Sequence, residues 1–226
     1  MDTIYPQMET TGDGTATFRH PVFGDTYHSL NGATAEAEHV YIQAGLAAAG
    51  KTDVKILEVG FGSGLNAWLT LMYGAGHMMN IDYTAVELYP VNPNVAIAAG
   101  YTDSPLFRHM HECAWDSPQR ITGQFTLTKY ATDLTRPDGA WERSRYDVVY
   151  FDAFAPDTQP EMWSNEIFAR IHTAMQPDGI LVTYSAKGSV KQALRNAGFQ
   201  VRRIAGAPGK RHMLQAVATR EAALPQ

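Results

Sequence analysis

The sequence predicts an α/β fold with a mainly parallel sheet whose last strand is antiparallel. Three observations support this fold class. From about residue 51, apolar β-branched runs alternate with helix-like segments, which is typical of parallel strands joined by helical crossovers. A glycine-rich turn follows the first of these runs. The chain closes with two strand-like runs joined by a short Gly/Pro/Lys-rich loop, so the final strand must run antiparallel to its predecessor.

The alternation assigns most segments of the chain to a strand or a helix. Strands are predicted at 54–59, 82–87, 125–129, 146–151, 179–184, 199–204 and 212–219. Helices are predicted at 65–73, 92–100, 164–175 and 187–197. Residues 101–122 are expected to be helical but interrupted by Pro105 and Pro118. We therefore expect the sheet domain to occupy residues 51–220 and a short tail to occupy 221–226.

Residues 1–50 are expected to form an N-terminal extension that packs on this domain. Within it, residues 16–29 predict a β-hairpin that turns at 21–25, and residues 34–49 predict a helix. Such an extension could cover a ligand bound at the edge of the sheet.

Length and composition are those of an ordinary globular domain of 226 residues with 45% hydrophobic residues. The single cysteine, Cys113, allows no internal disulfide, which suits a reducing compartment. The N-terminal residues lack the pattern of a signal peptide, and no apolar run could span a bilayer. We expect a cytoplasmic protein without membrane contact. The sequence is compatible with a monomer but does not reveal the oligomeric state.

Charge is unevenly distributed along the chain. The formal net charge is -5, yet residues 185–226 hold eight of the 18 Lys and Arg residues and one of the 23 Asp and Glu residues. A basic segment of this kind is either a polyanion-binding surface or a solvated helix face and a charge-protected sheet edge. Charge alone leaves both interpretations open.

The glycine-rich turn predicts a cofactor site. Gly60, Gly62 and Gly64 follow the first strand and precede a helix, where glycine lets the backbone turn tightly and approach a ligand. Leu65 stands where a dinucleotide-binding turn has its last glycine. Glu58, just before the turn, would repel a diphosphate but suits the sulfonium and amino groups of S-adenosylmethionine. The sequence thus favours S-adenosylmethionine over a dinucleotide or an empty turn.

Three acids follow later strands of the predicted sheet. Glu87 closes the second strand, where a carboxylate can accept hydrogen bonds from both ribose hydroxyls. Asp133 follows the third strand, where we expect contact with the adenine amino group. Asp152 follows the fourth strand, beside the expected methyl donor, where it could orient an amine and accept its proton. We therefore predict Asp152 as the catalytic residue.

Several segments together resemble one family. They are Phe23-Gly24-Asp25-Thr26-Tyr27-His28-Ser29-Leu30-Asn31-Gly32, Glu58-Val59-Gly60-Phe61-Gly62-Ser63-Gly64-Leu65-Asn66, Asp152-Ala153-Phe154-Ala155-Pro156 and Gly209-Lys210-Arg211-His212-Met213-Leu214. They resemble the tRNA 5-aminomethyl-2-thiouridine methyltransferases, found as the N-terminal domain of the bifunctional enzyme MnmC. The resemblance covers roughly residues 20 to 218. It implies a class I S-adenosylmethionine-dependent methyltransferase: a Rossmann-like, seven-stranded sheet with an antiparallel last strand.

The resemblance also implies the reaction and further site residues. The methyl group would pass to the aminomethyl nitrogen of wobble uridine 34 in the anticodon region of tRNA, giving 5-methylaminomethyl-2-thiouridine. Asn66 would line the cofactor pocket with the residues named above, and Asn31 and Glu36 would lie near its mouth. Phe154 and Tyr184 could stack on the base, and Lys210 and Arg211 could contact phosphates. Because the sequence ends at Gln226 without a second dinucleotide turn, we expect a stand-alone form that binds neither FAD nor a metal.

Two other functions remain open from the sequence. The first is another class I methyltransferase or an aminopropyltransferase acting on a small amine. An aminopropyltransferase needs several acids for a polycation, whereas Asp152 and Asp157 are the acids in the loop after the fourth strand. The second is a non-catalytic binding protein, which the joint presence of Glu58, Glu87 and Asp152 disfavours.

Overall fold

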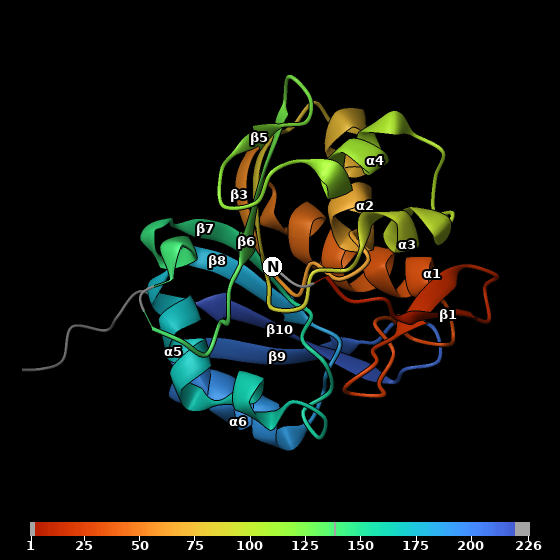
Figure 1. Cartoon of the computed structure of the whole chain (residues 1–226). Helices are drawn as coiled ribbons and strands as arrows, with labels where there is room; N and C mark the ends of the chain where they lie inside the picture. The colour runs from red at the N-terminus through yellow and green to blue at the C-terminus, as the bar shows by residue number, and fades with distance from the viewer. Residues whose placement is uncertain (1–2, 138, 220–226) are drawn as a thin grey trace, which may run out of the picture.

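A computed structural model describes residues 3–137 and 139–219, and the predicted tail at 221–226 lies outside these residues. Within them, an eight-stranded sheet forms the centre of the molecule (Figure 1), in the order β5-β6-β4-β3-β7-β8-β10-β9. The mutually parallel strands are β3 (Asp53–Val59), β4 (Asn80–Glu87), β6 (Phe125–Ala131), β7 (Tyr146–Phe151) and β8 (Met175–Thr183). The predicted α/β class with a mainly parallel sheet is confirmed.

The last strand, β10 (His212–Ala218), is antiparallel as predicted and pairs with both β8 and β9 (Phe199–Ala205). It therefore lies one place in from the edge of the sheet. Residues 206–211 form too short a link for a crossover, so β10 must return alongside β9. The central residues of β10 are buried. The edge strand β9 exposes Arg202 and Arg203, and these charged side chains protect the sheet edge from pairing with another chain. An eighth strand that the sequence did not predict, β5 (Gln119–Arg120), pairs antiparallel with β6 at the other edge.

Helices cover both faces of the sheet because the strands alternate their side chains between two cores. In β7, Val148 and Tyr150 enter one core, and Val149 and Phe151 enter the other. The first core contains side chains of α1 (Ala33–Ala37), η1 (Glu38–Ala47), α2 (Leu65–Gly76) and α4 (Pro105–Glu112), and α3 (Pro93–Ala98) packs beside α4. The second contains those of α5 (Asn165–Thr173) and α6 (Gly188–Asn196), with the 3₁₀ turns η2 (Ala140–Arg143) and η3 (Pro160–Trp163). Figure 1 shows the two groups on opposite sides of the strands.

The predicted helices are all present, with shifts at their ends. Asn92 and Ser164 cap α3 and α5 by accepting hydrogen bonds from backbone N–H groups inside the first turn. The irregular stretch 101–122 resolves into α4, which Ser104 caps, and strand β5. The predicted helix at 34–49 is continuous, but residues Glu38–Ala47 have the wider turns of a π-helix.

The N-terminal hairpin differs from the prediction. Strand β2 (Ala16–Arg19) pairs with β1 (Gln7–Thr10), and the predicted partner segment after residue 25 meets β2 at a single bridge, Arg19 to Thr26. The predicted turn at 21–25 is present, because His20 N donates to the Asp25 carbonyl and Tyr27 N to the Phe18 carbonyl, each at 2.9 Å. The sequence did not predict β1, the strand that pairs with β2 along its length. Asp13 fixes the turn between β1 and β2 by accepting hydrogen bonds from Thr11 and Thr15. In the described part of the chain, no helix is long and apolar enough to cross a membrane.

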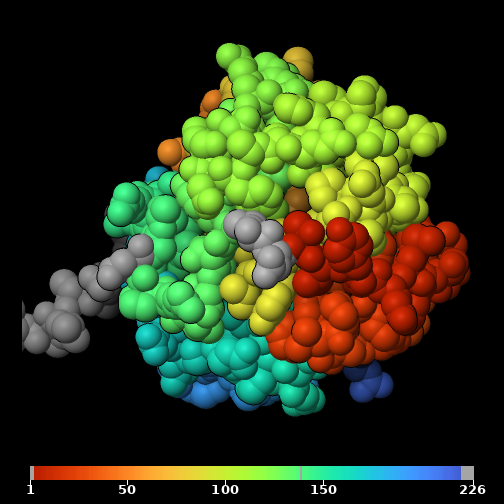
Figure 2. All heavy atoms as spheres, in the orientation of Figure 1, coloured from red at the N-terminus to blue at the C-terminus, as the bar shows by residue number. Residues whose placement is uncertain are grey.

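The extension lies against the body of the molecule. Figure 2 shows the N-terminal segment, red to orange, packed against the yellow and green segments on the face in view. Tyr101 of the body donates a hydrogen bond to the carbonyl of Ala16 at 2.8 Å, and Phe18 is fully buried. The extension is thus an integral part of the packed structure.

Truncating Phe18 tests this packing. We expect Phe18→Ala to lower the free energy of unfolding by about 3 kcal/mol, because a buried aromatic ring is lost and a cavity remains. Val22 lies in the same extension but is 72% exposed, so Val22→Ala should change stability by less than about 0.5 kcal/mol. Urea unfolding of both variants measures the difference, and equal stabilities would contradict the integral packing of the extension.

Candidate active site

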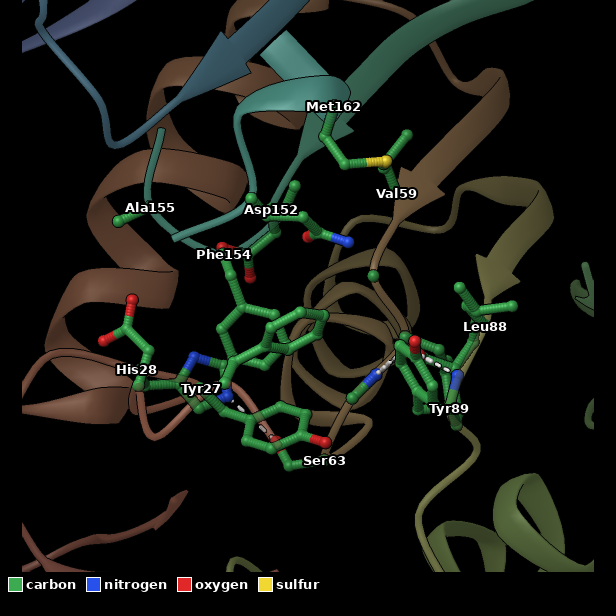
Figure 3. Close-up of a pocket in the computed structure, with 18 of the residues that line it drawn as sticks. Tyr27, His28, Val59, Ser63, Leu88, Tyr89, Asp152, Phe154, Ala155 and Met162 are labelled. Atoms are coloured by element: carbon green, nitrogen blue, oxygen red, sulfur yellow. Dashed lines mark hydrogen bonds between the residues drawn. The ribbon is translucent and has the colours of Figure 1, made fainter. Parts of the chain in front are cut away.

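The candidate site lies where four parallel strands end. The chain runs from β3 outward through β4 and β6, and then returns to β7 on the other side of β3. Ligands of open α/β sheets bind at such a switch point, beyond the carboxyl ends of the strands. A pocket of about 1040 Å³, counted with its open mouth, occupies this position (Figure 3). The strand ends form its inner wall, and residues of the N-terminal extension form part of the opposite wall.

The glycine turn after β3 brings the backbone close to two neighbours. A Cβ on Gly60 would lie 2.6 Å from the carbonyl oxygen of Asp152, and a Cβ on Gly62 would lie 2.7 Å from the Tyr27 ring. Both glycines also have positive φ, +92° and +50°. Any larger residue would therefore push the turn away from β7 or from the extension.

Two histidines fix the next residue of the turn, Ser63. The Nε2 atom of His28 lies 2.8 Å from Ser63 Oγ, and Nε2 of His111 lies 3.1 Å from the Ser63 carbonyl. Burial lowers the pKa of His28 to about 4 and that of His111 to about 3, so both rings are neutral near pH 7. The pocket-side turn is thus held from the extension and from α4 without added charge.

Glu87 joins the ends of β4 and β3. Its Oε2 accepts a hydrogen bond from Gly62 N at 2.9 Å, and its Oε1 accepts one from Tyr89 N at 2.7 Å. Burial raises the pKa of Glu87, while these backbone bonds oppose the rise. A carboxylate oxygen has two lone pairs, so acceptor capacity remains toward the pocket.

Asp133 lies in the same wall, after β6. Its Oδ1 accepts hydrogen bonds from the backbone N and hydroxyl of Thr135, at 2.9 and 2.6 Å. Its Oδ2 lies 3.8 Å from Arg136 Nε. The local turn thus orients this carboxylate at the rim of the pocket.

Asp152 stands at the end of β7 with two side-chain donors. The Tyr41 hydroxyl donates to Oδ1 at 2.5 Å, and Asn66 Nδ2 donates to Oδ2 at 2.8 Å. Burial raises the pKa of Asp152 to about 7, against the lowering effect of these two bonds; Glu36 raises it further and Lys210 lowers it. Asp152 therefore changes protonation near neutral pH, as a proton-accepting group in this range must.

Lys210 and Glu36 close the side of the pocket beyond Asp152. They form an ion pair between the β9–β10 loop and α1, and the Lys210 ammonium lies 4.6 Å from the centre of the Tyr184 ring. Tyr184 in turn donates to the Ala153 carbonyl at 2.8 Å. The Glu36–Lys210 pair thus links α1 of the N-terminal extension to the β9–β10 loop.

Aromatic rings gather at the mouth of the pocket. Phe154 lies 5.1 Å from the rings of Tyr27, Phe23 and His20, measured between ring centres. Tyr89 packs against His20 and Phe23 in the same group. Figure 3 shows Tyr27 and Phe154 side by side within the pocket. The mouth therefore offers flat apolar surfaces beside polar walls.

The structure brings most of the predicted site residues to the pocket wall. These are Gly60, Gly62, Glu87, Asp133, Asp152, Glu36, Phe154, Tyr184 and Lys210. Tyr27, which the sequence suggested as a stacking partner for a base, also lines the pocket. The residues that sequence reasoning missed, among them His28, Tyr41 and Ser63, contact the site across long sequence separations. His28 lies within the N-terminal motif and Ser63 within the glycine-rich motif, and these motifs were the signals that could have identified them.

Five predicted residues lie elsewhere. Gly64 begins α2 and packs against His111, and Asn66 lies behind Asp152. Glu58 is fully buried and does not line the pocket. Asn31 packs against Gly209 of the β9–β10 loop, and Arg211 is exposed on that loop.

The charge of the wall restricts the ligand. Of the residues described as lining the pocket, Lys210 is the only Lys or Arg, and it is paired with Glu36. The carboxylates in the wall are Asp25, Glu36, Glu87, Asp133 and Asp152. Such a wall attracts cations and repels a diphosphate. The pocket thus suits a positively charged or neutral ligand.

Comparisons with known proteins agree with this geometry. Residues 116–219 match a family described as S-adenosyl-L-methionine-dependent methyltransferase. Two similar proteins are the tRNA 5-methylaminomethyl-2-thiouridine biosynthesis bifunctional proteins MnmC of Nitrosospira multiformis and Burkholderia thailandensis. They are 31% and 32% identical over 85% and 89% of this chain, which covers 34% and 33% of their lengths. The chain thus spans about a third of these relatives.

The fold is similar to that in the crystal structure of MNMC2 from Aquifex aeolicus. The TM-score is 0.77 at 23% identity, and the match covers all of this chain and 73% of that chain.

Replacing Asp152 by Asn tests its raised pKa through stability. The folded protein binds this proton more tightly than the unfolded chain, so the wild type loses stability as pH rises from the ordinary value of 3.8 to about 7. Asp152→Asn has no such carboxyl group to titrate. As pH rises over that range, the free energy of unfolding of the variant should therefore increase relative to that of the wild type by on the order of a few kcal/mol. Urea unfolding at a series of pH values measures the difference. Asp157→Asn is the control, because the Asp157 side chain is 84% exposed, and its stability should vary with pH as that of the wild type does. If the stability of Asp152→Asn also varied with pH as that of the wild type does, this would contradict the raised pKa of Asp152.

Proposed function

Because the chain belongs to the MnmC family of S-adenosyl-L-methionine-dependent methyltransferases, we propose that it methylates the aminomethyl nitrogen of 5-aminomethyl-2-thiouridine at wobble position 34 of tRNA. The product would be 5-methylaminomethyl-2-thiouridine. The observation that carries this proposal is the position of Asp152, which borders the glycine turn on one side and the Glu36–Lys210 region on the other. A tRNA substrate would place the chain in the cytoplasm.

The donor half of the pocket fits S-adenosylmethionine in its chemistry. Gly60 and Gly62 would approach the methionine part, and Glu87 would accept hydrogen bonds from the ribose hydroxyls. Asp133 would receive the adenine amino group, and Leu88, Leu134 and Met162 supply apolar surface for the ring. The acidic wall stabilises a positively charged sulfur and offers nothing to a pyrophosphate. None of these contacts requires a metal or a flavin.

The acceptor half fits a primary amine attached to a base. Asp152 would accept a hydrogen bond from the amine and orient its lone pair toward the methyl carbon. S-adenosylmethionine supplies a methyl group on a positively charged sulfur, and the nitrogen–carbon bond forms as the carbon–sulfur bond breaks, with the bonding electrons remaining on sulfur. Ionised Asp152 takes the proton that the nitrogen must lose. The rate should therefore rise with pH through about 7.

The aromatic mouth and the basic loop fit the remainder of a tRNA substrate. Phe154 and Tyr184 would stack on a flipped wobble base. Arg202, Arg203 and Arg211 are exposed on β9 and the β9–β10 loop, which also places Lys210 in the pocket. Phosphates of the tRNA backbone that bind along this loop would lie next to the base in the pocket. Lys187 is also exposed, but it pairs with Asp157.

A polyamine acceptor is the main competitor, since five carboxylates line the pocket. Each of these five already has a partner, as described above for Glu87, Asp133 and Asp152. Glu36 is paired with Lys210, and Asp25 accepts hydrogen bonds from Thr158 Oγ1 at 3.1 Å and Thr26 N at 2.9 Å. The acceptor side therefore has less free negative charge than a polycation needs.

A methyl-transfer assay tests the proposal directly. Labelled S-adenosylmethionine and tRNA carrying the aminomethyl wobble uridine should give label in that nucleoside. Asp152→Ala should keep cofactor affinity within several-fold and lose about 100-fold or more in kcat, because amine orientation and proton acceptance are both removed. Asp157→Ala in the same loop is the control. Label in polyamine instead of tRNA, or full turnover by Asp152→Ala, would refute this assignment.

Salt dependence tests the basic loop. Replacing Arg202, Arg203 and Arg211 by Ala should weaken tRNA binding and reduce the slope of log K against log salt by roughly one for each lost phosphate contact. Arg108 and Arg120 are exposed on α4 and β5 at the other edge of the sheet, so their double Ala variant should keep the wild-type slope. Equal slopes for both variants would locate the tRNA elsewhere.

A further inference from the structure

A group of unpartnered polar atoms lies beneath the pocket. Both carboxyl oxygens of Glu58, the Tyr83 hydroxyl and Oδ1 of Asn66 are buried and have no hydrogen-bond partner within the described residues. Glu58 and Tyr83 are 0% exposed, and Asn66 is 2% exposed. Buried polar atoms without partners are costly, so this group needs an arrangement of protons that pairs them.

The strands and α2 bring these side chains together. Glu58 points to the same side of β3 as Ile56, into the core covered by η1 and α2. Its neighbour on β7 is Tyr150, and Tyr83 lies on β4 beside Ile56. The Tyr83 hydroxyl and the Asn66 amide are close enough to lower the pKa of Glu58, while burial raises that pKa more strongly.

The remaining groups around Glu58 offer no positive charge. Asp152 and Glu87 are the nearby acids and raise its pKa further. Tyr150 is hydrogen-bonded to Thr70 Oγ1 at 3.2 Å, and Tyr41 packs on Tyr150 and donates to Asp152. Among the groups that act on Glu58 in the described chain, none is a Lys, Arg or His. A charged Glu58 would therefore be an uncompensated buried carboxylate.

A proton on Glu58 would supply the donor that Asn66 Oδ1 lacks. Asn66 directs Nδ2 toward Asp152, so its Oδ1 is left as an acceptor on the other side. A carboxylic acid at Glu58 would have a proton to donate to this oxygen, and its other oxygen could still accept from the Tyr83 hydroxyl, which is near enough to act on Glu58. An ionised Glu58 has no proton to donate and would leave Asn66 Oδ1 unpaired.

We propose that Glu58 and Asp152 form a coupled pair of carboxyl groups, bridged by the Asn66 amide, in which Glu58 keeps one proton and leaves Asp152 free to act as the base. Glu58 is then a positioning residue and makes no contact with the cofactor. Its proton fixes the orientation of the Asn66 amide, and that orientation supplies Asp152 with a donor that favours its ionised form. The role given to Asp152 rests on the proposed function, whereas the protonation of Glu58 does not.

Infrared spectroscopy of the purified protein tests the protonation without any acceptor. At about pH 8, one unit above the value of about 7 for Asp152, the wild type minus Glu58→Gln difference spectrum should contain the C=O band of a protonated carboxylic acid. Glu142 is the control, because its bond to Arg170 lowers its pKa. The wild type minus Glu142→Gln spectrum should contain carboxylate bands alone. A carboxylate difference for Glu58 would overturn the proposal.

Measurements of cofactor affinity and of kcat then distinguish a positioning role of Glu58 from direct contact between Glu58 and the cofactor. Glu58→Gln can still donate to Asn66 and accept from Tyr83, so its Kd for S-adenosylmethionine should stay within about threefold of the wild type, below the tenfold that 1.4 kcal/mol represents. Its kcat should exceed that of Glu58→Ala by at least about tenfold. A tenfold or greater loss of cofactor affinity in Glu58→Gln would overturn the proposal.

The pH profile of kcat supplies the last readout. Asn66→Ala removes a donor that lowers the pKa of Asp152, so its profile should shift to higher pH, while that of Glu58→Gln should keep the wild-type midpoint. An unshifted Asn66→Ala profile would overturn the bridge. If no tRNA is methylated by the wild type, the proposed function fails, but the infrared and cofactor measurements still decide the state of Glu58.

Discussion

The contact between the ends of β3 and β7 is the constraint on which the rest of the site depends. Asp152 N donates to the Val59 carbonyl at 3.0 Å, and the Asp152 carbonyl lies where any Cβ on Gly60 would be. The cofactor turn and the candidate base are therefore positioned by the same pair of hydrogen-bonded strands. A donor and an acceptor bound on either side of this contact would meet in a fixed geometry, which is the main contribution a protein can make to a displacement reaction.

The N-terminal extension holds the parts of the pocket wall that the sheet does not fix. Tyr27 packs on Gly62, His28 bonds to Ser63, and Glu36 reaches Lys210 across the pocket. These polar contacts are largely removed from water, where hydrogen bonds are strong and unpaired groups are costly. The extension therefore orders the turn and the acceptor side together. The raised pKa of Asp152 follows from the same enclosure, since burial is its largest cause.

Much of the fold could be predicted from local patterns. The strand 146–151 was predicted with its observed bounds, and the other strands and helices predicted for residues 51–220 are present with shifted ends, because apolar periodicity and caps such as Ser164 act within a few residues. The partner of β2 was not predictable in this way. It depends on the Asp13 turn, which brings β1 alongside β2 while the 21–25 turn also forms, and on the packing of Tyr27 against a glycine about 35 residues away.

The sequence by itself determined the order of strands and helices, the glycine turn and the acids that follow β4, β6 and β7, because parallel strands bring their carboxyl ends to one edge. It indicated neither the direction in which Glu58 points nor the partners of Asp152. From its place before the turn, Glu58 was predicted to bind the cofactor, whereas the alternation of β3 directs its side chain into the core, near Tyr83 and Asn66. Only the tertiary structure decided this, because the environment of a buried carboxyl is set by strands, α2 and η1 that are distant in sequence and meet only in the folded core.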